Sequence, residues 1–447
     1  MKRRDFLAKA IITGSGLGLG ISCNQNKPAS GDKNTADEKV LPGNGRMITE
    51  PAREIPVLAK TDVLVIGGGP AGVAAAIAAG RAGAETYLVE RYNHLGGLWT
   101  GGLVLPLLST HAVDKQKKTR QVIYGIGGEM AQRLKDMSMT IDEVNPVIDP
   151  EAGKYVLDEM VRESGVKMLF HTWGTQVIMD GNVIKGVFVE SKSGRMAILA
   201  KVVVDCTGDG DIFHFAGYNY EVMKYKIGLV HRLGNIDRIS KNVPGYKDMP
   251  IGKPTPIKSV NWVNMAGKDE QDGLDIVNLS NLQLEYRKII WENYEQIKST
   301  PGHEEVFLLD TASQLGVRMS RILDGEYKLT LEDTMTYKNF DDVIGVSGAW
   351  TTMLYNGRRV APSERPMWQI PYRSLVPKKT DNLLVAGRCF CFEQKLVEDT
   401  RIIGTCLITG HGAGAAAALA VKERVTARDI DRSKLKELLT RQAAWLG

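Results

Sequence analysis

Three short apolar runs stand out along the chain, and each leads into a glycine. They occupy residues 63–66, 202–204 and 383–386. Unbroken apolar runs of this length, bounded by glycines, predict strands that are buried on both faces. Small-residue segments follow the first and the third run and predict helices that pack inside the fold. The pattern therefore predicts an α/β architecture built around a buried sheet.

A different pattern precedes the second run. Residues 151–164 place apolar side chains at helical spacing, and residues 166–170, 175–179 and 183–190 have the composition of short strands. A turn is predicted at residues 180–182, which read Asp-Gly-Asn. We expect these strands to form a β-meander inserted in the sheet domain.

The turn after the first run carries the glycine spacing of a dinucleotide-binding fold. Gly67, Gly69 and Gly72 follow the strand at GxGxxG spacing, and Glu90 ends the next predicted strand. These glycines permit a tight turn, close approach of a pyrophosphate and close helix packing. The helix N-terminus offers unpaired amides to phosphates, and Glu90 can accept hydrogen bonds from a ribose. Because strand, helix and acid accompany the glycines, dinucleotide binding is favoured over a simple glycine-rich turn.

Later motifs resemble those of flavoproteins with two dinucleotide-binding domains. A glycine pair follows Glu90, a Thr-Gly pair follows the second run, and a Gly-Arg pair follows the third. Together the segments are similar, over residues 61–421, to the FAD-dependent oxidoreductases that share their flavin module with the flavin-binding chain of heterodisulfide reductase. The resemblance implies a Rossmann-type domain with three-layer ββα organisation and FAD as the cofactor. The residues that it implies for FAD binding are Gly67, Gly69, Pro70, Ala71, Gly72, Glu90, Arg91, Gly96, Gly97, Thr100, Val177, Thr207, Gly208, Gly387, Arg388, Gly404, Thr405 and Gly412.

The middle of the chain interrupts the flavin fold and predicts a second, α+β cap domain for the substrate. It contains two predicted amphipathic helices, at residues 282–297 and 304–319. An insertion of this kind typically covers the cofactor and builds a pocket at its face. The predicted divisions of the chain are 1–22 (export signal), 23–58 (tether), 59–217 (first part of the FAD domain), 218–369 (cap), 370–425 (last part of the FAD domain) and 426–447 (C-terminal helix).

Candidate catalytic residues follow from what a flavin requires. Oxidation of an alcohol or amine needs a base for the second proton. Arg318 and Arg321 are three apart on a predicted helix and can clamp a carboxylate or polyol, or else form a structural ion-pair network. Tyr372 and Arg373 precede the third run, where the cap meets the flavin. His411, at the predicted start of the last helix, can face the flavin or cap the helix. Further candidates are His231, Arg232 and Arg401.

The first residues have the pattern of an export signal. Arg3 and Arg4 precede Phe6 and Leu7, which resembles the twin-arginine consensus, and the uncharged stretch that follows is short for a membrane span. The alternative is a short membrane anchor. Cys23, before a polar tract, resembles the lipidated cysteine of bacterial lipoproteins. We expect export of the folded protein to the periplasm, either free or as a lipoprotein.

Composition disfavours other classes of function. The formal charge is +5, and residues 1–22 hold four basic residues and one acidic residue, so the rest of the chain carries +2 and gives no case for nucleic-acid binding. The cysteines after Cys23 are not clustered as in an iron–sulfur protein, and the seven histidines lack paired spacing, so no metal site is predicted. Asp205, Asp209 and Asp211 also fit a calcium loop, but its downstream glutamate is missing.

These patterns lead to one principal hypothesis about function. We expect an exported FAD-dependent oxidoreductase that transfers hydride between flavin N5 and a small polar metabolite such as a sugar, polyol or carboxylate. No second nucleotide fingerprint supports NAD(P)H, so an external quinone or cytochrome is expected as the electron partner. The alternatives are a fumarate-reductase-like reductase of an unsaturated acid and a flavin electron carrier without its own substrate. The sequence leaves the oligomeric state open.

Overall fold

The three apolar runs form neighbouring parallel strands in a seven-stranded sheet. β1 (Val57–Ile66) lies between β2 (Thr86–Val89) and β10 (Gly194–Asp205) and pairs in parallel with both. β24 (Leu383–Val385) pairs in parallel with the end of β10, and β7 (Lys167–Leu169) pairs in parallel with β2. The apolar side chains of the three runs are buried on both faces, which confirms the predicted strand type.

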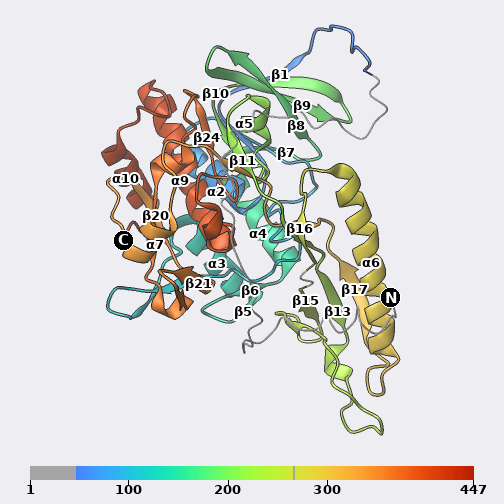
Figure 1. Cartoon of the computed structure of the whole chain (residues 1–447). Helices are drawn as coiled ribbons and strands as arrows, with labels where there is room; N and C mark the ends of the chain where they lie inside the picture. Colours follow the sequence, from blue (N-terminus) through green and yellow to red (C-terminus); the bar gives the residue numbers. More distant parts are fainter. Residues whose placement is uncertain (1–46, 265–266) are drawn as a thin grey trace, which may run out of the picture. The chain divides into compact units, whose positions relative to one another are not determined.

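The computed structural model describes residues 47–264 and 267–447 (Figure 1). Residues 55–447 form one compact unit, and residues 47–54, which carry no regular secondary structure, belong to another. The predicted export signal and Cys23 lie outside the described residues, as does the tether up to residue 46. β1 begins at Val57, so the last two residues assigned to the tether belong to the sheet.

Two of the three strands predicted for the β-meander, at residues 175–179 and 183–190, form it with the first half of β10 and cover one face of the parallel strands, whereas residues 166–170 form β7 of the parallel sheet. β8 (Trp173–Asp180) and β9 (Val183–Ser191) pair antiparallel, and β9 pairs antiparallel with the first half of β10. Leu64 and Ile66 of β1 pack into the apolar cluster that the meander forms on this face. Helices cover the opposite face, where the alternate side chains Val63 and Val65 are buried. The result is the expected three-layer arrangement (Figure 1).

Two small-residue helices, α2 (Pro70–Arg81) and α9 (Ile403–Glu423), pack against each other on the helical face (Figure 1). A Cβ added at Gly410 would lie 2.0 Å from the carbonyl oxygen of Ala71, and one at Gly414 would lie 2.0 Å from that of Ala75. Only glycine permits this approach of the two backbones. Because both contacts advance by four residues in the same direction, the helices run parallel.

α9 also determines how this face of the sheet is filled. It is long and apolar enough to cross a membrane, since an 18-residue stretch of it has a mean hydropathy of 1.3. However, 94% of that stretch is buried within the fold. It packs on α2 and on β20 (Val343–Ser347). This burial is typical of a central core helix.

The cap segment contains the first of its two predicted helices. α6 (Ile276–Lys298) begins at Asp275, whose side chain accepts hydrogen bonds from the amides of Val277 and Asn278. This N-cap removes two of the unpaired donors at the start of the helix. α6 buries Leu282, Tyr286 and Ile290 against the cap, in agreement with the predicted helical period.

The prediction of a second cap helix, at residues 304–319, is wrong. This segment forms β17 (Phe307–Thr311), which pairs antiparallel with β13 (His231–Gly234), and β18 (Gly316–Val317), which pairs antiparallel with β12 (Tyr225–Gly228). The partners lie about 80 to 90 residues earlier in the chain. Pairing and packing with such distant strands outweigh a local helical period.

The remaining elements complete the sheet edges and the cap. The longer helices are α3 (Gly125–Asp136), α4 (Pro150–Glu163) and α10 (Arg432–Arg441), and the short ones are α5 (Asp211–Phe215), α7 (Leu331–Thr336) and α8 (Val397–Thr400). The short strands are β3 (His111–Val113), β4 (Thr119–Gln121), β5 (Thr140–Ile141), β6 (Val147–Ile148), β11 (Tyr220–Val222), β14 (Lys253–Pro254), β15 (Asn261–Val263), β16 (Lys268–Gln271), β19 (Arg321–Leu323), β21 (Met353–Tyr355), β22 (Arg358–Val360) and β23 (Trp368–Pro371).

The contact between α2 and α9 predicts an unusual response to alanine. Gly414→Ala should lower the free energy of unfolding by about 1–3 kcal/mol, because the new methyl group forces the helices apart. Gly128→Ala on α3 is the matched control, since its Cβ would meet nothing closer than 3.4 Å. That change should leave stability unchanged or raise it by about 0.5–1 kcal/mol. Urea unfolding measures both, and equal effects at the two positions would contradict the packing argument.

Candidate functional site

The turn between β1 and α2 leaves room on one side only. Gly67 has φ +101°, and a Cβ there would lie 2.4 Å from the carbonyl oxygen of Cys206. A Cβ at Gly72 would lie 1.7 Å from the carbonyl oxygen of Gly67, whereas one at Gly69 would meet nothing within 4 Å. α2 has no side-chain cap and no acidic residue in its first turn. Its first amides therefore remain available to an anionic group that approaches from the side of Gly69.

Glu90 is fixed at the end of β2, beside this turn. Its side chain is 5% exposed, and its Oε2 accepts a hydrogen bond of 2.6 Å from the amide of Gly68. Its Oε1 accepts one of 2.8 Å from the amide of Tyr92. Arg91 stacks its guanidinium on the rings of Tyr92 and Trp173, at 5.0 and 5.4 Å from their centroids. The carboxylate expected to contact a ribose is thus held rigidly next to the glycine turn.

The glycine pair after Glu90 lies against the same turn. The amide of Gly96 donates to the carbonyl oxygen of Gly68 at 2.8 Å, and a Cβ at Gly97 would lie 3.1 Å from Cα of Gly69. Thr100 turns its hydroxyl inward and donates to the carbonyl oxygen of Leu95. The glycine pair therefore borders the open space, while Thr100 stabilises the loop that carries the pair.

The ends of β10 and β24 complete this cradle. Asp205, fully buried, accepts hydrogen bonds from the amide and the hydroxyl of Thr207 and from the amides of Ile212 and Phe213, and its burial raises its pKa. Gly208 has φ +77°, and a Cβ there would lie 2.6 Å from the guanidinium of Arg388. Parallel strands that end together form the edge where nucleotides bind in such sheets.

Gly387 connects the end of β24 to both helices. Its amide donates to the Thr409 hydroxyl at 3.0 Å, and a Cβ there would lie 3.1 Å from Cβ of Ala71. Gly387 therefore lies beside the first turn of α2.

The last helix begins earlier than predicted. α9 starts at Ile403, so Gly410 and Gly414 lie in its interior and their function is to contact α2. A Cβ at Gly412 would lie 2.6 Å from Ile344 of β20. The predicted cofactor role of Gly412 is therefore corrected to helix packing.

The offset between the two parallel helices locates the second end of the site. Gly410 faces Ala71, the second residue of α2, so α9 extends about six residues further at its N-terminus. At a rise of about 1.5 Å per residue, this places the start of α9 about 9 Å beyond the start of α2. Gly404 and Thr405 lie in that first turn, which carries no acidic residue. The two helix N-termini can therefore face two parts of one extended ligand.

Val177 lies away from this cradle. It is 7% exposed, in the middle of β8, and packs in the apolar cluster between the meander and the parallel strands. Its opposite neighbour in β9 is Val187. The structure gives this side chain a core role in place of the expected cofactor contact.

An acid–arginine cluster surrounds the end of β10. The Asp209 carboxylate accepts hydrogen bonds of 2.6 Å from Arg388 and from Ser320. Arg321 donates to the carbonyl oxygen of Asp209 at 2.9 Å and to the carboxylate of Asp211 at 3.2 Å. Burial favours the neutral form of Asp209, but Arg388 outweighs it and holds the pKa of Asp209 below its usual value. These pairings argue against a calcium loop, because arginines occupy the carboxylates.

Arg321 therefore does not join Arg318 as predicted. It belongs to β19, and its guanidinium faces the carboxylates near β10. Arg318 follows β18, outside any helix. The expectation of a shared helical face failed because the helix itself is absent from this described segment.

Tyr372 and Arg373 are packing residues. The Tyr372 hydroxyl donates to the carbonyl oxygen of Ala427 at 2.5 Å, and burial raises the pKa of this 1% exposed side chain. Arg373 pairs with Asp342 at 2.9 Å and stacks on Tyr327. Their predicted catalytic roles are corrected, since both side chains are engaged within the protein.

The two candidate histidines are also internal. His411 lies in the middle of α9, shares a hydrogen bond of 2.7 Å with Gln442, and burial lowers its pKa to about 4. Burial likewise lowers the pKa of His231 in β13 to about 4, and its neighbour Arg232 pairs with Asp310 at 2.5 Å. Neither imidazole has the near-neutral pKa of an effective proton acceptor.

A second polar cluster lies at the N-terminal end of α9. The sequence predicted only some of its members. The Tyr225 hydroxyl, from β12, donates to the Glu398 carboxylate at 2.6 Å, and Arg401 pairs with the other oxygen of Glu398. Arg318 lies within electrostatic range of Glu398 and Arg401. The arginines were candidates, whereas Tyr225 and Glu398 were missed; the spacing of Glu398 and Arg401 by three residues was the available signal. We call these four residues the arginine cluster.

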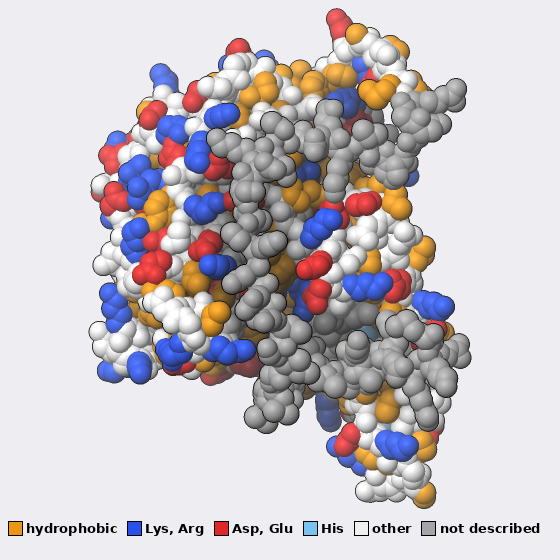
Figure 2. Space-filling view, in the orientation of Figure 1, with side chains coloured by type: hydrophobic (Ala, Val, Ile, Leu, Met, Phe, Trp, Pro, Cys, Tyr) orange, Lys and Arg blue, Asp and Glu red, His pale blue; other side chains and the backbone are white. Residues whose placement is uncertain are grey.

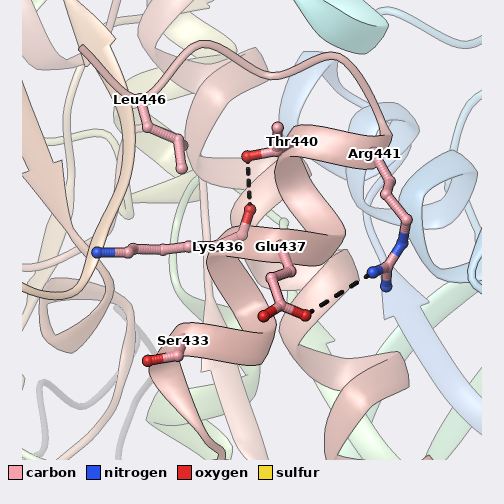
Figure 3. A pocket seen from close by; sticks show the side chains of 6 residues that line it. All are labelled: Ser433, Lys436, Glu437, Thr440, Arg441 and Leu446. Atoms are coloured by element: carbon pink, nitrogen blue, oxygen red, sulfur yellow. Dashed lines mark hydrogen bonds and ion pairs between the residues drawn. The ribbon is translucent and has the colours of Figure 1, made fainter.

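The surface has a depression that is separate from the predicted site residues, and its charged side chains are mixed. An open depression of about 560 Å³ lies on α10 (Figure 3), where Thr440 donates to the carbonyl oxygen of Lys436 and Glu437 faces Arg441 at 4.0 Å. None of the predicted site residues lines it. On the face shown in Figure 2, basic and acidic side chains of the described residues are interspersed, in agreement with the small formal charge.

The four cysteines after Cys23 are buried and free of disulfides. Burial raises the pKa of each thiol, to about 11 for Cys391 and about 12 for Cys406. Within residues 47–264 and 267–447, no group of three histidine, cysteine, aspartate or glutamate side chains is arranged to hold a metal ion.

Comparison with known proteins identifies the family to which this cradle corresponds. The sequence pattern of the family described as FAD dependent oxidoreductase matches residues 62–237 and 232–439. The chain is 27% identical over 264 residues to digeranylgeranylglycerophospholipid reductase of Picrophilus torridus, covering 55% of this chain and 63% of that protein. It is 28% identical over 165 residues to thiamine thiazole synthase of Aeropyrum pernix, covering 33% and 55%.

Among solved structures, the chain is similar to a geranylgeranyl bacteriochlorophyll reductase-like protein of Thermoplasma acidophilum, with 15% identity, a TM-score of 0.45 and coverage of 86% and 84%. It is also similar to p-nitrophenol 4-monooxygenase of Pseudomonas putida, with 11% identity, a TM-score of 0.44 and coverage of 86% and 88%.

The acid–arginine cluster predicts a pH-dependent stability. Burial, with Asp209 nearby, raises the pKa of Asp211 from 3.8 to about 6. The folded protein therefore binds this proton more tightly than the unfolded chain, and stability is lost as pH rises from about 4 to 6. Asp211→Asn removes this dependence, so its stability relative to the parent should increase across that window. Urea unfolding at pH values of about 4, 5, 6 and 7 measures the difference, and a constant difference would refute the assignment.

Proposed function

The chain belongs to the FAD-dependent oxidoreductase family, and on that premise we propose that it transfers hydride between FAD and a small polar metabolite. The metabolite is a sugar, polyol or carboxylate. The relatives include a reductase and a thiazole synthase, of which the chain spans 63% and 55%. The substrates in the names of these relatives are therefore not assigned to this chain.

The observation that carries the proposal is the offset between the two helix N-termini. The first amides of α2 face the open side of the glycine turn, where they would bind the pyrophosphate. Glu90 would hold the adenosine ribose. About 9 Å further along the parallel pair, the first amides of α9 would face the flavin ring. Gly97, Gly208 and Gly387 would border the ligand between these two ends. The cradle thus fits FAD, which when bound supplies a two-electron acceptor or donor at N5.

The chain's own residues then orient the ligand and its substrate. Partial positive charge at the start of α9 would stabilise negative charge that develops on the flavin when it is reduced. The cap strands β12 and β18 and the segment before α9 bring polar side chains to this end. The substrate is proposed to bind there, under the cap and away from the nucleotide end.

The electron partner is proposed to be an external quinone or cytochrome. The sequence offers one nucleotide fingerprint, after β1, which FAD would occupy. The flavin module is proposed to be of the type shared with heterodisulfide reductase, on the strength of the Thr-Gly and Gly-Arg pairs. Titration of the purified flavoprotein distinguishes the two directions: bleaching by metabolites indicates oxidation, and reoxidation of the dithionite-reduced protein by unsaturated acids indicates reduction.

FAD retention provides the direct test of the cradle. Glu90→Ala should weaken FAD binding by about 10-fold or more, because a carboxylate that accepts ribose hydrogen bonds is lost. Glu437→Ala, at the exposed depression on α10, serves as the control and should keep full FAD content. Flavin absorbance after gel filtration gives the stoichiometry. Equal FAD content in both variants would refute the ribose assignment.

The setting of the reaction is proposed to be outside the cytoplasm. Arg3 and Arg4 fit a twin-arginine signal, and a pathway that carries folded proteins suits a chain that binds FAD before export. Replacing both arginines by lysine should leave the FAD-loaded protein in the cytoplasm. Cell fractionation with a flavin assay measures this, and Cys23→Ser, tested in parallel, should release the exported protein from the membrane fraction. Unchanged export of the double lysine variant would contradict the proposal.

A further inference from the structure

Two neighbouring hairpins bring exposed side chains to one part of the surface. The first connects β3 and β4 through residues 114–118, and the second connects β21, labelled in Figure 1, to β22 through residues 356–357. The amide of Met367 donates to the carbonyl oxygen of Val113 in β3 at 2.8 Å. β3 also packs against η2 (Pro362–Glu364), the short 3-10 helix that follows β22. These contacts place the two hairpins next to each other.

Basic residues outnumber acidic ones on this surface. The six exposed basic residues, which we call the basic patch, are Lys115, Lys117, Lys118, Arg120, Arg358 and Arg359. Three acids lie beside them, Asp114, Glu332 and Glu364, so six basic residues against three acids leave an excess of three positive charges. Residues 23–447 together carry +2, so the rest of them carries −1. The positive charge of the chain after the predicted export signal is therefore concentrated in this patch.

The three acids are engaged within the hairpins and leave part of the patch without a counter-charge. Asp114 pairs with Arg120 at 2.6 Å and accepts hydrogen bonds from two amides of its own turn. Glu364, which is also in electrostatic range of Lys117, pairs with Arg358 at 2.7 Å. Glu332 accepts from a tyrosine hydroxyl at 2.6 Å. Among the described residues, no hydrogen bond or ion pair engages the side chains of Lys117, Lys118 and Arg359.

Two large apolar side chains are exposed among these charges. Leu354 is 67% exposed and lies directly opposite Arg359 in the ladder of β21 and β22, so both side chains point to the same face. Trp350 is 40% exposed. Its segment lies against the first hairpin, since a Cβ at Gly348 would lie 2.7 Å from Cβ of Ala112. Apolar and basic side chains therefore share one surface.

We propose that the basic patch binds an anionic phospholipid bilayer, with Leu354 and Trp350 inserted between the headgroups. Lysine and arginine near a bilayer surface attract anionic headgroups, and their long stems keep the charge at the surface while apolar neighbours enter it. Tryptophan is suited to this boundary because its ring is apolar and its N–H is polar. Basic residues around exposed apolar side chains are the combination that interfacial membrane binding uses.

The patch lies beside the segment that leads into α9. The fully buried carboxylate of Asp399 accepts hydrogen bonds from the amides of Trp350 and Thr351. It also pairs at 2.6 Å with Arg365, which follows the second hairpin, and α9 begins four residues later at Ile403. A bilayer at the patch is therefore close to the end of the cradle proposed for the flavin ring. This position suits an electron partner dissolved in lipid.

A fluorescent probe at the patch tests the contact directly. The full chain carries Cys23→Ser and Leu354→Cys, and the new thiol is labelled with an environment-sensitive fluorophore, since the other four cysteines are buried. Vesicles of phosphatidylcholine mixed with phosphatidylglycerol should shift the emission to shorter wavelength, and the shift should decrease at high salt. Vesicles of phosphatidylcholine alone should have no effect. A label at Lys192→Cys, in the exposed turn between β9 and β10, is the control and should not respond.

Charge removal tests the part played by the basic residues. Replacing three of them should weaken vesicle binding about 100-fold, or about fivefold for each residue. The matched control removes two lysines and one arginine that are exposed on the cap, and it should bind as the parent does. The patch variant carries Lys117→Gln, Lys118→Gln and Arg359→Gln. The control variant carries Lys241→Gln, Arg287→Gln and Lys288→Gln.

The possible outcomes decide between a bilayer and other partners. An equal response to neutral vesicles, an equal response of the label at Lys192→Cys, or equal weakening by the two triple variants would overturn the proposal. No response to vesicles together with a shift on adding polyglutamate would also overturn it and would indicate an acidic protein partner. The inference goes beyond the proposed function, and its test needs no flavin signal. Failure of FAD binding would therefore leave it standing.

Discussion

The close parallel contact of α2 and α9 is the constraint on which the rest of the site depends. Backbone approaches of this kind require glycine, and Gly410 and Gly414 supply it at a spacing of four residues. The contact fixes how far α9 extends past α2, and so the distance between the two helix N-termini that are proposed to face one ligand. The sheet below positions the strand ends at the same edge. A small change in side-chain volume between these helices would therefore alter both the stability and the span of the cradle.

The nucleotide end of the molecule was predictable because its chemistry is local. The roles of Gly67 and Gly72 follow from a turn of a few residues, and the structure places a Cβ at either one in collision with backbone. Glu90 ends the second strand and lies beside the turn, as its spacing implied. The meander was also predictable, since short alternating strands joined by a tight turn pair with their immediate neighbours.

The substrate end was less predictable because its contacts are distant in sequence. The segment at 304–319 has a helical period but forms strands with partners from residues 225–234. Arg321 therefore lies against Asp209 and Asp211, and Arg318 lies near a cluster that includes Tyr225. His411 and Tyr372 have side chains suited to proton transfer, yet both are buried inside the protein, and burial is not visible in a single sequence.

The buried cysteines have a consequence for how the protein behaves in an oxidising environment. A thiol reacts with oxidants and alkylating agents mainly as the thiolate, and burial suppresses that form in all four cysteines. These four thiols therefore react slowly with such reagents while the chain is folded. Cys406 lies in α9, and a Cβ added at Gly72 of α2 would lie 3.2 Å from Cβ of Cys206, so labelling of these two thiols would report the opening of the helix pair. The reactivity of the buried thiols therefore provides a measure of local unfolding.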